Sequence, residues 1–229
     1  MPGVRGVAAW NNKDQLTEEM NMPRFFLPLA VIALGLATGS AANAQSNVTC
    51  TGTLAAGTYN NVTVPNDASC TIGTGVLVIA SVSVGSGATL DMLGATVDGN
   101  VTAKNATSIT IDEAEPAAVI STVGTNVTLV GTTGLILIRN ASIGVNLTIV
   151  GSTGAEVHLL HNTVGTNLVV QGDSGLAIPQ IALNMVGGNL ACVDNTPPPS
   201  DIIAGIPSPN TVGGTASGQC ARLVGITPG

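Results

Sequence analysis

Side chains that could carry out chemistry are few in this chain, and the densest group of them is acidic. Asp112, Glu113 and Glu115 lie directly before Pro116. Clustered carboxylates could bind calcium, or could act as the paired acids of a glycoside hydrolase. They fall in the longest of the chain's internal repeats, where an insertion would project from the fold. We therefore interpret them as an acidic surface loop, with a weak calcium site as the alternative.

A polysaccharide lyase would also need a basic residue close to such acids. The basic residues within the repeats are Lys104 and Arg139, and they lie in different repeats. A lyase site would have to be assembled from these two side chains. We therefore expect no catalytic residue, no cofactor and no enzymatic activity, and we keep a polysaccharide-active enzyme as the alternative function.

The second chemically suggestive group is the pair His158 and His161, with Glu156 beside it. Imidazole and carboxylate groups are common metal ligands. On a β-strand, residues two positions apart share a face, so Glu156 and His158 point the same way while His161 points elsewhere. A third partner would have to come from a neighbouring repeat, and Arg139 is the nearest candidate by alignment. We predict a solvated surface pair and no metal site.

Four cysteines, two near each end of the predicted mature chain, complete the reactive side chains. An even number of cysteines in an exported protein favours disulfides, and the C-x-x-C spacing typical of a zinc site is missing. Three pairings are possible. We favour Cys50 with Cys70 and Cys192 with Cys220, because each pair would close a loop at one end and stabilise it by roughly 3 kcal/mol.

The expectation of export comes from the first 44 residues. Arg24 is followed by an apolar run over 25–39 and by an A-x-A sequence that ends at Ala44. This order is typical of a secretory signal peptide, so we predict cleavage after Ala44 and a secreted, periplasmic or extracellular bacterial protein. The run is shorter than the ~20 residues of a membrane span, so we expect none after cleavage. Acids are unusual ahead of a signal, which leaves Met20 or Met22 as alternative starts.

The composition of the predicted mature chain excludes nucleic-acid binding. After residue 44 the chain has three basic residues, ten acidic residues and one aromatic residue, Tyr59. Nucleic-acid binding needs basic side chains for the phosphates, and often aromatic side chains that stack on bases. We therefore expect no nucleic-acid partner. The net charge of −7 for the whole chain suits a soluble exported protein.

Internal repeats determine the predicted fold. Segments such as Gly99-Asn100-Val101-Thr102 and Thr125-Asn126-Val127-Thr128 recur along the chain at a nearly regular spacing. Each marker Asn opens a short alternating segment, which is followed by a turn containing Gly and by a second apolar run. A second Asn marker leads into Ser-Ile-Gly, Thr-Val-Gly or Met-Val-Gly. The first markers are Asn100, Asn126, Asn146, Asn167 and Asn189, and the second are Asn140, Asn162 and Asn184.

These repeats predict an all-β fold, a parallel β-helix of short strands with 20–26 residues per turn. Val, Ile and Thr alternate with polar residues between turn residues, which indicates strands. Units made only of strands and turns can stack about 4.8 Å apart. We predict a right-handed coil, since parallel crossovers are nearly always right-handed, and keep an antiparallel sandwich as the alternative. Stacked Asn side chains would form ladders that satisfy the turns.

Three segments carry a family resemblance. They are the opening 48–65, the repeated Asn-x-Val-Gly-x-Asn-Leu units, and the closing Asn-Leu-Ala-Cys-Val-Asp-Asn-Thr-Pro-Pro-Pro at 189–199. With cysteines at both ends, the sequence over 47–220 resembles a group of secreted bacterial right-handed parallel β-helix repeat proteins of unassigned function. The resemblance implies the fold and the compartment, and it supplies no catalytic residue.

The chain divides into four parts on these grounds. We predict a signal region at 1–44, an N-terminal cap at 45–72, β-helix repeats at 73–191 and a Pro-rich C-terminal cap at 192–229. The caps would cover the strand edges at the two ends of the stack. The prolines of the second cap cannot donate to a strand ladder, so we expect an irregular strap there.

The outward surface of the stack carries the remaining functional expectation. If Val127 and Leu129 face the core, outward residues of successive turns align in columns. These columns form a flat face of Thr and Val, and large apolar faces tend to bind partners. We expect a non-enzymatic structural or surface-interaction protein that self-associates or adheres through this face, with ice binding as a further alternative. The members of the face are Thr102, Thr128, Thr148, Val130 and Val150.

Overall fold

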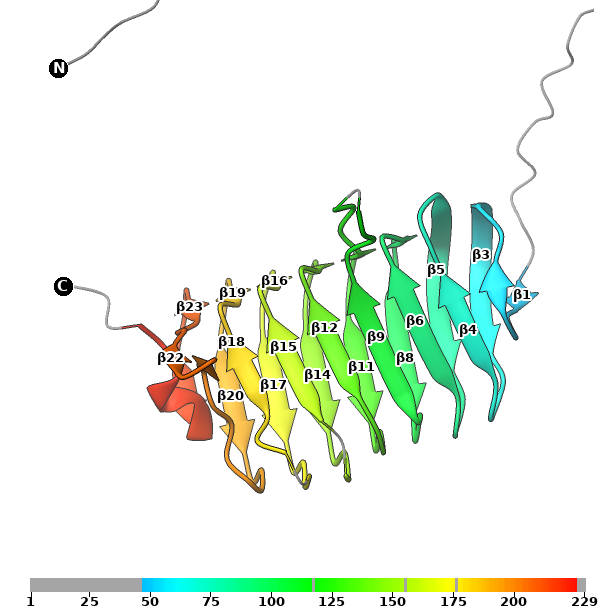
Figure 1. The fold of residues 1–229 in the computed structure, drawn as a ribbon. Coiled ribbons are helices and arrows are strands. Elements are labelled where there is room, and N and C mark those ends of the chain that lie inside the picture. Colours follow the sequence, from blue (N-terminus) through cyan, green and yellow to red (C-terminus); the bar gives the residue numbers. More distant parts are fainter. Residues whose placement is uncertain (1–46, 117, 155, 176, 226–229) are drawn as a thin grey trace, which may run out of the picture. The chain divides into compact units, whose positions relative to one another are not determined.

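The computed structural model describes residues 47–225 apart from 117, 155 and 176, so the predicted signal region lies outside the described residues. The described chain winds into a parallel β-solenoid of about 7 turns (Figure 1). The predicted all-β parallel β-helix is therefore confirmed, while its right hand stays a prediction. Within this part of the chain, no helix has the length and apolar character needed to cross a membrane.

Each full turn of the solenoid crosses three faces, and the strands of each face pair in parallel with their equivalents in the adjacent turns. The strands of the long face are β1 (Val48–Thr49), β3 (Gly57–Val64), β5 (Val76–Val84), β8 (Asn100–Lys104), β11 (Val127–Val130), β14 (Leu147–Val150), β17 (Leu168–Gln171), β20 (Leu190–Val193) and β24 (Ala216–Gly218). The strands of the narrow face, which joins the long face through β5, are β7 (Thr96–Val97), β10 (Thr122–Val123), β13 (Ser142–Ile143), β16 (Thr163–Val164), β19 (Met185–Val186) and β23 (Thr211–Val212). The strands of the third face are β2 (Thr53–Leu54), β4 (Ser69–Ile72), β6 (Thr89–Leu93), β9 (Ser108–Asp112), β12 (Ile136–Arg139), β15 (Val157–Leu160) and β18 (Gln180–Ala182).

Alternation of apolar and polar residues places one aliphatic column after another inside the coil. In β11, Val127 and Leu129 are fully buried, and Thr128 between them points outward. Their partners in the next turn are Leu147 and Ile149, which are also fully buried. Burying each such side chain contributes about 1.5–3 kcal/mol, so the repeated column forms the hydrophobic core.

The length of the turns is not constant. Val82 pairs with Val101 in the following turn, and Val101 pairs with Val127 in the turn after that. The turn from Val82 to Val101 is therefore one residue shorter than the lower limit of the predicted 20–26 residues per turn. The extra residues of the turn from Val101 to Val127 lie after β9 and form the projecting loop seen in Figure 1, as the sequence predicted for the acidic insertion.

A column of glycines makes the tight corner that follows the narrow face. Gly144 approaches the carbonyl oxygen of Gly124, and Gly165 approaches that of Gly144. The same contact recurs in the turns that hold Gly187 and Gly213. A Cβ atom on any of these residues would overlap the carbonyl oxygen of the turn before. Glycine is therefore required here by the stacking distance between turns.

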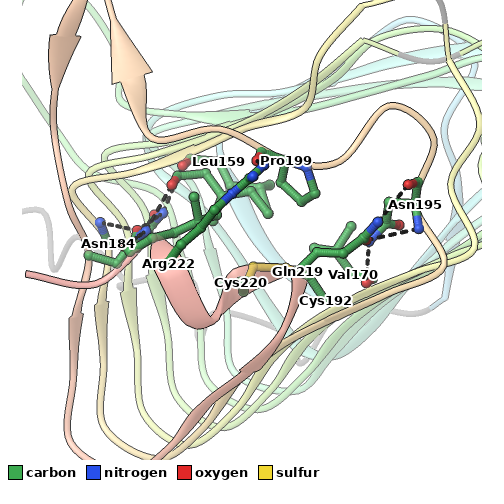
Figure 2. The surroundings of a disulfide bond; sticks show 12 residues. Leu159, Val170, Asn184, Cys192, Asn195, Pro199, Gln219, Cys220 and Arg222 are labelled. Atoms are coloured by element: carbon green, nitrogen blue, oxygen red, sulfur yellow. Dashed lines mark hydrogen bonds between the residues drawn. A yellow bond between two sulfur atoms is a disulfide. The ribbon is translucent and has the colours of Figure 1, made fainter.

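Disulfides lie at both ends of the stack, with the pairing favoured from the sequence. Cys50 is bonded to Cys70 and Cys192 to Cys220, with Cα atoms 5.5 and 5.1 Å apart. The second bond attaches the 3₁₀ turn η1 (Gln219–Arg222) to the last long strands (Figure 2). It covers the C-terminal end of the core, where Cys220 and Leu223 are buried.

The C-terminal segment is more regular than the irregular strap expected from its prolines. After residues 197–199 the chain forms an antiparallel hairpin of β21 (Ile202–Ile203) and β22 (Ile206–Pro207). Strands β23 and β24 then rejoin the parallel ladder beside β19 and β20. The prolines interrupt the parallel ladder only in the hairpin region. The residues after the hairpin contain the Thr-Val-Gly sequence that forms the corner in earlier turns.

Replacing a stacked glycine should destabilise the solenoid strongly. We expect Gly144→Ala to lower the free energy of unfolding by about 3 kcal/mol, because the new Cβ forces two turns apart. Urea unfolding followed by circular dichroism measures this. The matched control is Gly52→Ala, whose new Cβ meets no atom within 4 Å and which should change stability by no more than about 0.5 kcal/mol. Equal stability of the two variants would contradict the stacking requirement.

Removing one disulfide should loosen one end only. Cys192→Ala with Cys220→Ala opens a closed loop with a separation of 28 residues, which costs roughly 3–4 kcal/mol in the chain-entropy model. Hydrogen exchange should rise over 190–224 and stay unchanged over 48–72. The Cys50→Ala and Cys70→Ala pair should give the reverse pattern. Uniform loss of protection along the chain would show that the bonds do not act as separate end caps.

Candidate functional site

The predicted acidic surface loop is wrong for its first member. Asp112 ends β9 and is only 5% exposed. Its carboxylate accepts hydrogen bonds from Arg139 at the end of β12, with Nε 3.0 Å and Nη2 2.7 Å from Oδ2. The hydrogen bond and the charge of Asp112 raise the pKa of the Arg139 guanidinium, and partial burial opposes this. The pair is therefore an ion pair between adjacent turns, which leaves Asp112 unavailable as a metal ligand.

The other two acids do not join Asp112 in a site. Glu113 accepts a hydrogen bond from Asn140 Nδ2 at 2.7 Å, while Glu115 is exposed in the projecting loop. The base of this loop is fixed by the buried Ser121, whose hydroxyl donates to the carbonyl oxygen of Asp112 at 2.6 Å. Among the residues that the structure describes, no three His, Cys, Asp or Glu side chains are arranged to hold a metal ion.

The loop does create a shallow hollow that we did not expect from the sequence. Glu113 and His161 both line this hollow of about 250 Å³, together with Ile120, Asn140 and Thr163. Glu113 is the only acid in its lining, so the two opposed carboxylates of a glycoside hydrolase are not assembled there. The signal that could have found it is the spacing between Asn140 and His161, which equals one turn of the coil.

The histidine pair behaves as a surface feature. Val157 and Leu159 are buried, and His158 points outward between them. Its Nδ1 lies 3.0 Å from Gln180 Oε1, and its Nε2 lies 3.7 Å from Glu156 Oε2. His161 lies at a corner with a positive φ of 57°, so the two imidazoles do not share a strand face.

Arg139 is not the third member of that group. The strand register aligns Arg139 with Leu160 and aligns Leu137 with His158. The guanidinium of Arg139 is bound to Asp112 in the turn before, whereas His158 lies in the turn after. The alignment of the markers Asn140 and Asn162 is displaced by one residue from the observed register, which aligns Asn140 with His161.

The first predicted Asn ladder is confirmed. The side-chain amide of each Asn donates to the Oδ1 atom of the equivalent Asn in the turn before, at 3.0–3.1 Å. The backbone N–H of Asn146, Asn167 and Asn189 donates to the same oxygen. The ladder therefore provides hydrogen-bond partners at the corner between the narrow and long faces in five turns. Its members are Asn100, Asn126, Asn146, Asn167 and Asn189.

The second predicted ladder is wrong in its first member, Asn140, which lies one residue before the position that aligns with Asn162. The register aligns Ala141 with Asn162 and Asn184, and their column continues to Asn210. Asn162 Nδ2 donates to Asn184 Oδ1 at 3.0 Å and to Ile138 O at 2.7 Å. Asn140 instead lies at the preceding corner position with a positive φ of 48°. The repeat of Asn-Thr-Val-Gly at 162–165 and 210–213 was the signal for the missing member Asn210.

A third ladder follows the long face and was not predicted. The N–H of Ser152 donates to Asp173 Oδ1 at 2.7 Å, and the N–H of Asp173 donates to Asn195 Oδ1 at 3.0 Å. Asn195 Nδ2 in turn donates to Gln219 Oε1 at 3.0 Å (Figure 2). The residue type changes at every step, so no repeated motif identifies this ladder in the sequence.

The predicted outward columns of the long face are present. Thr102, Thr128 and Thr148 lie in register, and Lys104, Val130 and Val150 form the next column. The hydroxyl column is longer than the sequence suggested, because Thr63 and Ser83 continue it toward the N-terminal end. A shallow groove of about 420 Å³ lies on this face. Its lining is Ser83, Val84, Thr102, Ala103, Lys104, Thr128 and Val130.

The corrected ladder register can be tested by substitution. Asn162→Ala removes two side-chain hydrogen bonds and leaves the buried N–H of Ala141 unpaired, so the free energy of unfolding should fall by about 2–4 kcal/mol. Asn140→Gly is the control, because glycine tolerates the positive φ at this position. The Asn140 side chain bonds only to the half-exposed Glu113, so this variant should cost less than about 1 kcal/mol. Thermal unfolding measures both. A larger effect at Asn140 would restore the register expected from the sequence.

A scan against protein-family models, a search of curated proteins and a search of solved structures found no match to this chain. The parallel β-solenoid is therefore established by the strand pairing itself. The resemblance to secreted bacterial β-helix proteins stays an expectation that rests on the quoted motifs.

Proposed function

We propose that this protein is a secreted, non-enzymatic structural protein that associates with copies of itself through the long face. The observation that carries the proposal is the outward column of Thr63, Ser83, Thr102, Thr128 and Thr148, which continues through Val169, Ala191 and Ser217 without a charged residue. Flat sheet surfaces of this kind, with Val130 and Val150 alongside, are typical of partner surfaces.

The distribution of charge supports self-association through this face. The chain carries a net charge of −7, so two copies repel each other over most of their surfaces. Among the outward residues of strands β8 to β20 on the long face, Lys104 is the single charged side chain. Two copies can therefore meet there without like-charge repulsion between acids. A two-fold arrangement would place the same face on both sides of the contact.

Secretion is supported by two independent features. The described residues contain two disulfides and no free cysteine, and disulfides persist mainly in oxidising compartments. The sequence before residue 45 has the order of a signal peptide that ends at Ala44. Together they favour an extracytoplasmic location.

Placing a charge on the long face should abolish self-association. Thr128→Glu adds a carboxylate at a half-buried outward position of β11, where it would face its own copy across the two-fold contact. Sedimentation equilibrium should show a mass that rises with concentration for the wild type and a constant monomer mass for the variant. Thr148→Glu should weaken association in the same way.

The matched control is Thr122→Glu, which places the same charge at a half-buried outward position of β10 on the narrow face. It should associate like the wild type. A wild-type protein that stays monomeric at all concentrations would overturn self-association. Release of reducing ends from a glycan panel, lost in Glu113→Gln, would overturn the non-enzymatic assignment.

The length of the hydroxyl column specifically favours ice binding as the second candidate function. Six hydroxyls, from Thr49 to Thr148, repeat along one direction at the stacking distance of about 4.8 Å. The neighbouring column is Lys, Val, Val and Gln. Ice binding predicts a freezing-point depression below the melting point that Thr128→Glu removes. Self-association without such a depression supports the first proposal.

A further inference from the structure

Every buried Asn of the second and third ladders uses its side-chain N–H group in the same way. Asn184 Nδ2 donates to Leu159 O at 2.7 Å and to Asn210 Oδ1 at 2.9 Å. Asn195 Nδ2 donates to Val170 O at 2.9 Å and to Gln219 Oε1 at 3.0 Å. The side-chain nitrogen therefore always faces two oxygen acceptors, one in the turn before and one in the turn after.

Asp173 occupies one of these positions. Its Oδ1 accepts from the N–H of Ser152, and its own N–H donates to Asn195 Oδ1, as in the Asn ladders. Its Oδ2 therefore stands where an Asn has its nitrogen. By analogy with the Asn side chains of the ladders, Oδ2 faces Asn195 Oδ1 in the turn after and the carbonyl oxygen of Ile149 in the turn before. Ile149 lies three residues before Ser152.

That oxygen has no hydrogen-bond partner. Asp173 is 3% exposed, and both its Oδ2 and the buried hydroxyl of Ser152 are without a hydrogen-bond partner. An ionised carboxylate would set a negative oxygen against two further acceptors in a buried corner, which is costly. A proton on Oδ2 would convert the same atom into a donor that can reach one of them.

We propose that in mild acid the folded protein holds Asp173 as a neutral carboxylic acid, whose proton supplies the hydrogen bond that the third ladder otherwise lacks. Burial raises the pKa of Asp173, and the hydrogen bond from the N–H of Ser152 opposes the rise. The adjacent corners at 150–154 and 193–197 contain one titratable residue, the exposed Asp194. Neither corner provides a cation that would hold the carboxylate in its ionised form.

The proposal makes the stability of the solenoid depend on pH in an unusual direction. Because the folded-state pKa is above the ordinary value of about 3.9, the folded state binds the proton more tightly than the unfolded chain. This contribution to stability is complete below the ordinary pKa, and is lost as the pH rises through the folded-state pKa. The C-terminal turns should therefore be more stable in mild acid than at neutral pH.

Asp173→Asn tests the assignment directly, because an amide supplies the missing donor at every pH. At neutral pH the unfolding equilibrium constant should fall about tenfold for each unit by which burial has raised the pKa. The difference from the wild type should shrink as the pH is lowered toward about 4. Asp194→Asn is the control at the neighbouring exposed position, and should change neither the stability nor its pH dependence.

A second measurement uses the unmodified protein. Carbon-13 NMR of the Asp173 carboxyl carbon should show titration above the ordinary aspartate value of about 3.9. Titration of Asp173 in the ordinary range would overturn the proposal. So would an Asp173→Asn protein that is less stable than the wild type at neutral pH, because a neutral donor would then not be what this corner requires.

Discussion

Parallel stacking of one turn on the next is the constraint on which the rest of this structure depends. The strands of each face pair with the same strands of the adjacent turns, at the distance of about 4.8 Å that separates hydrogen-bonded strands. Equivalent residues therefore lie directly above one another along the whole coil. Each position has to tolerate a similar residue as its neighbour on both sides. Aliphatic residues meet this condition in the core, because stacked Val, Leu and Ile side chains exclude water together.

The corners meet the same condition with two residue types. Glycine is needed where the backbone of one turn touches the next, as at Gly124, Gly144 and Gly165. Asparagine is needed where a corner buries backbone groups, because its amide both donates and accepts. An Asn column can therefore continue through any number of turns, and it stops where another residue type takes the position, as at Ala141. The disulfides lie at the two ends of the stack, where no further turn can pair with the last one.

Charged residues are the exceptions to stacking, and each has its own solution. Asp112 lies beside Arg139 in the next turn, so opposite charges replace like residues. Asp173 lies between Ser152 and Asn195 and has no charged partner, which makes its proton part of the ladder. The outward positions of the long face avoid the problem by carrying almost no charge. The near absence of charge that allows turns to stack on the long face would also allow two molecules to associate through that face.

Much of the fold followed from the sequence, because the repeated Asn-x-Val-Gly motif, the alternation of Val and Thr, and the paired cysteines are local signals. They were sufficient for the solenoid, the first Asn ladder, the disulfides and the outward Thr column. The projecting loop was also predictable, since the turn that contains it, between Val101 and Val127, is the longest of the repeats with marker Asn residues.

Burial at the corners was decided only by the tertiary structure, whereas the register of one marker was misread. Asn140 lies four residues before Gly144 and Asn162 lies three residues before Gly165, so the two residues occupy different corner positions. The burial of Asp112 depends on Arg139 in the following turn, and that of Asp173 on Asn195. A sequence shows what each turn contains, but hydrogen bonding between turns determines which residue lies above which, and therefore which polar groups are enclosed and need a partner.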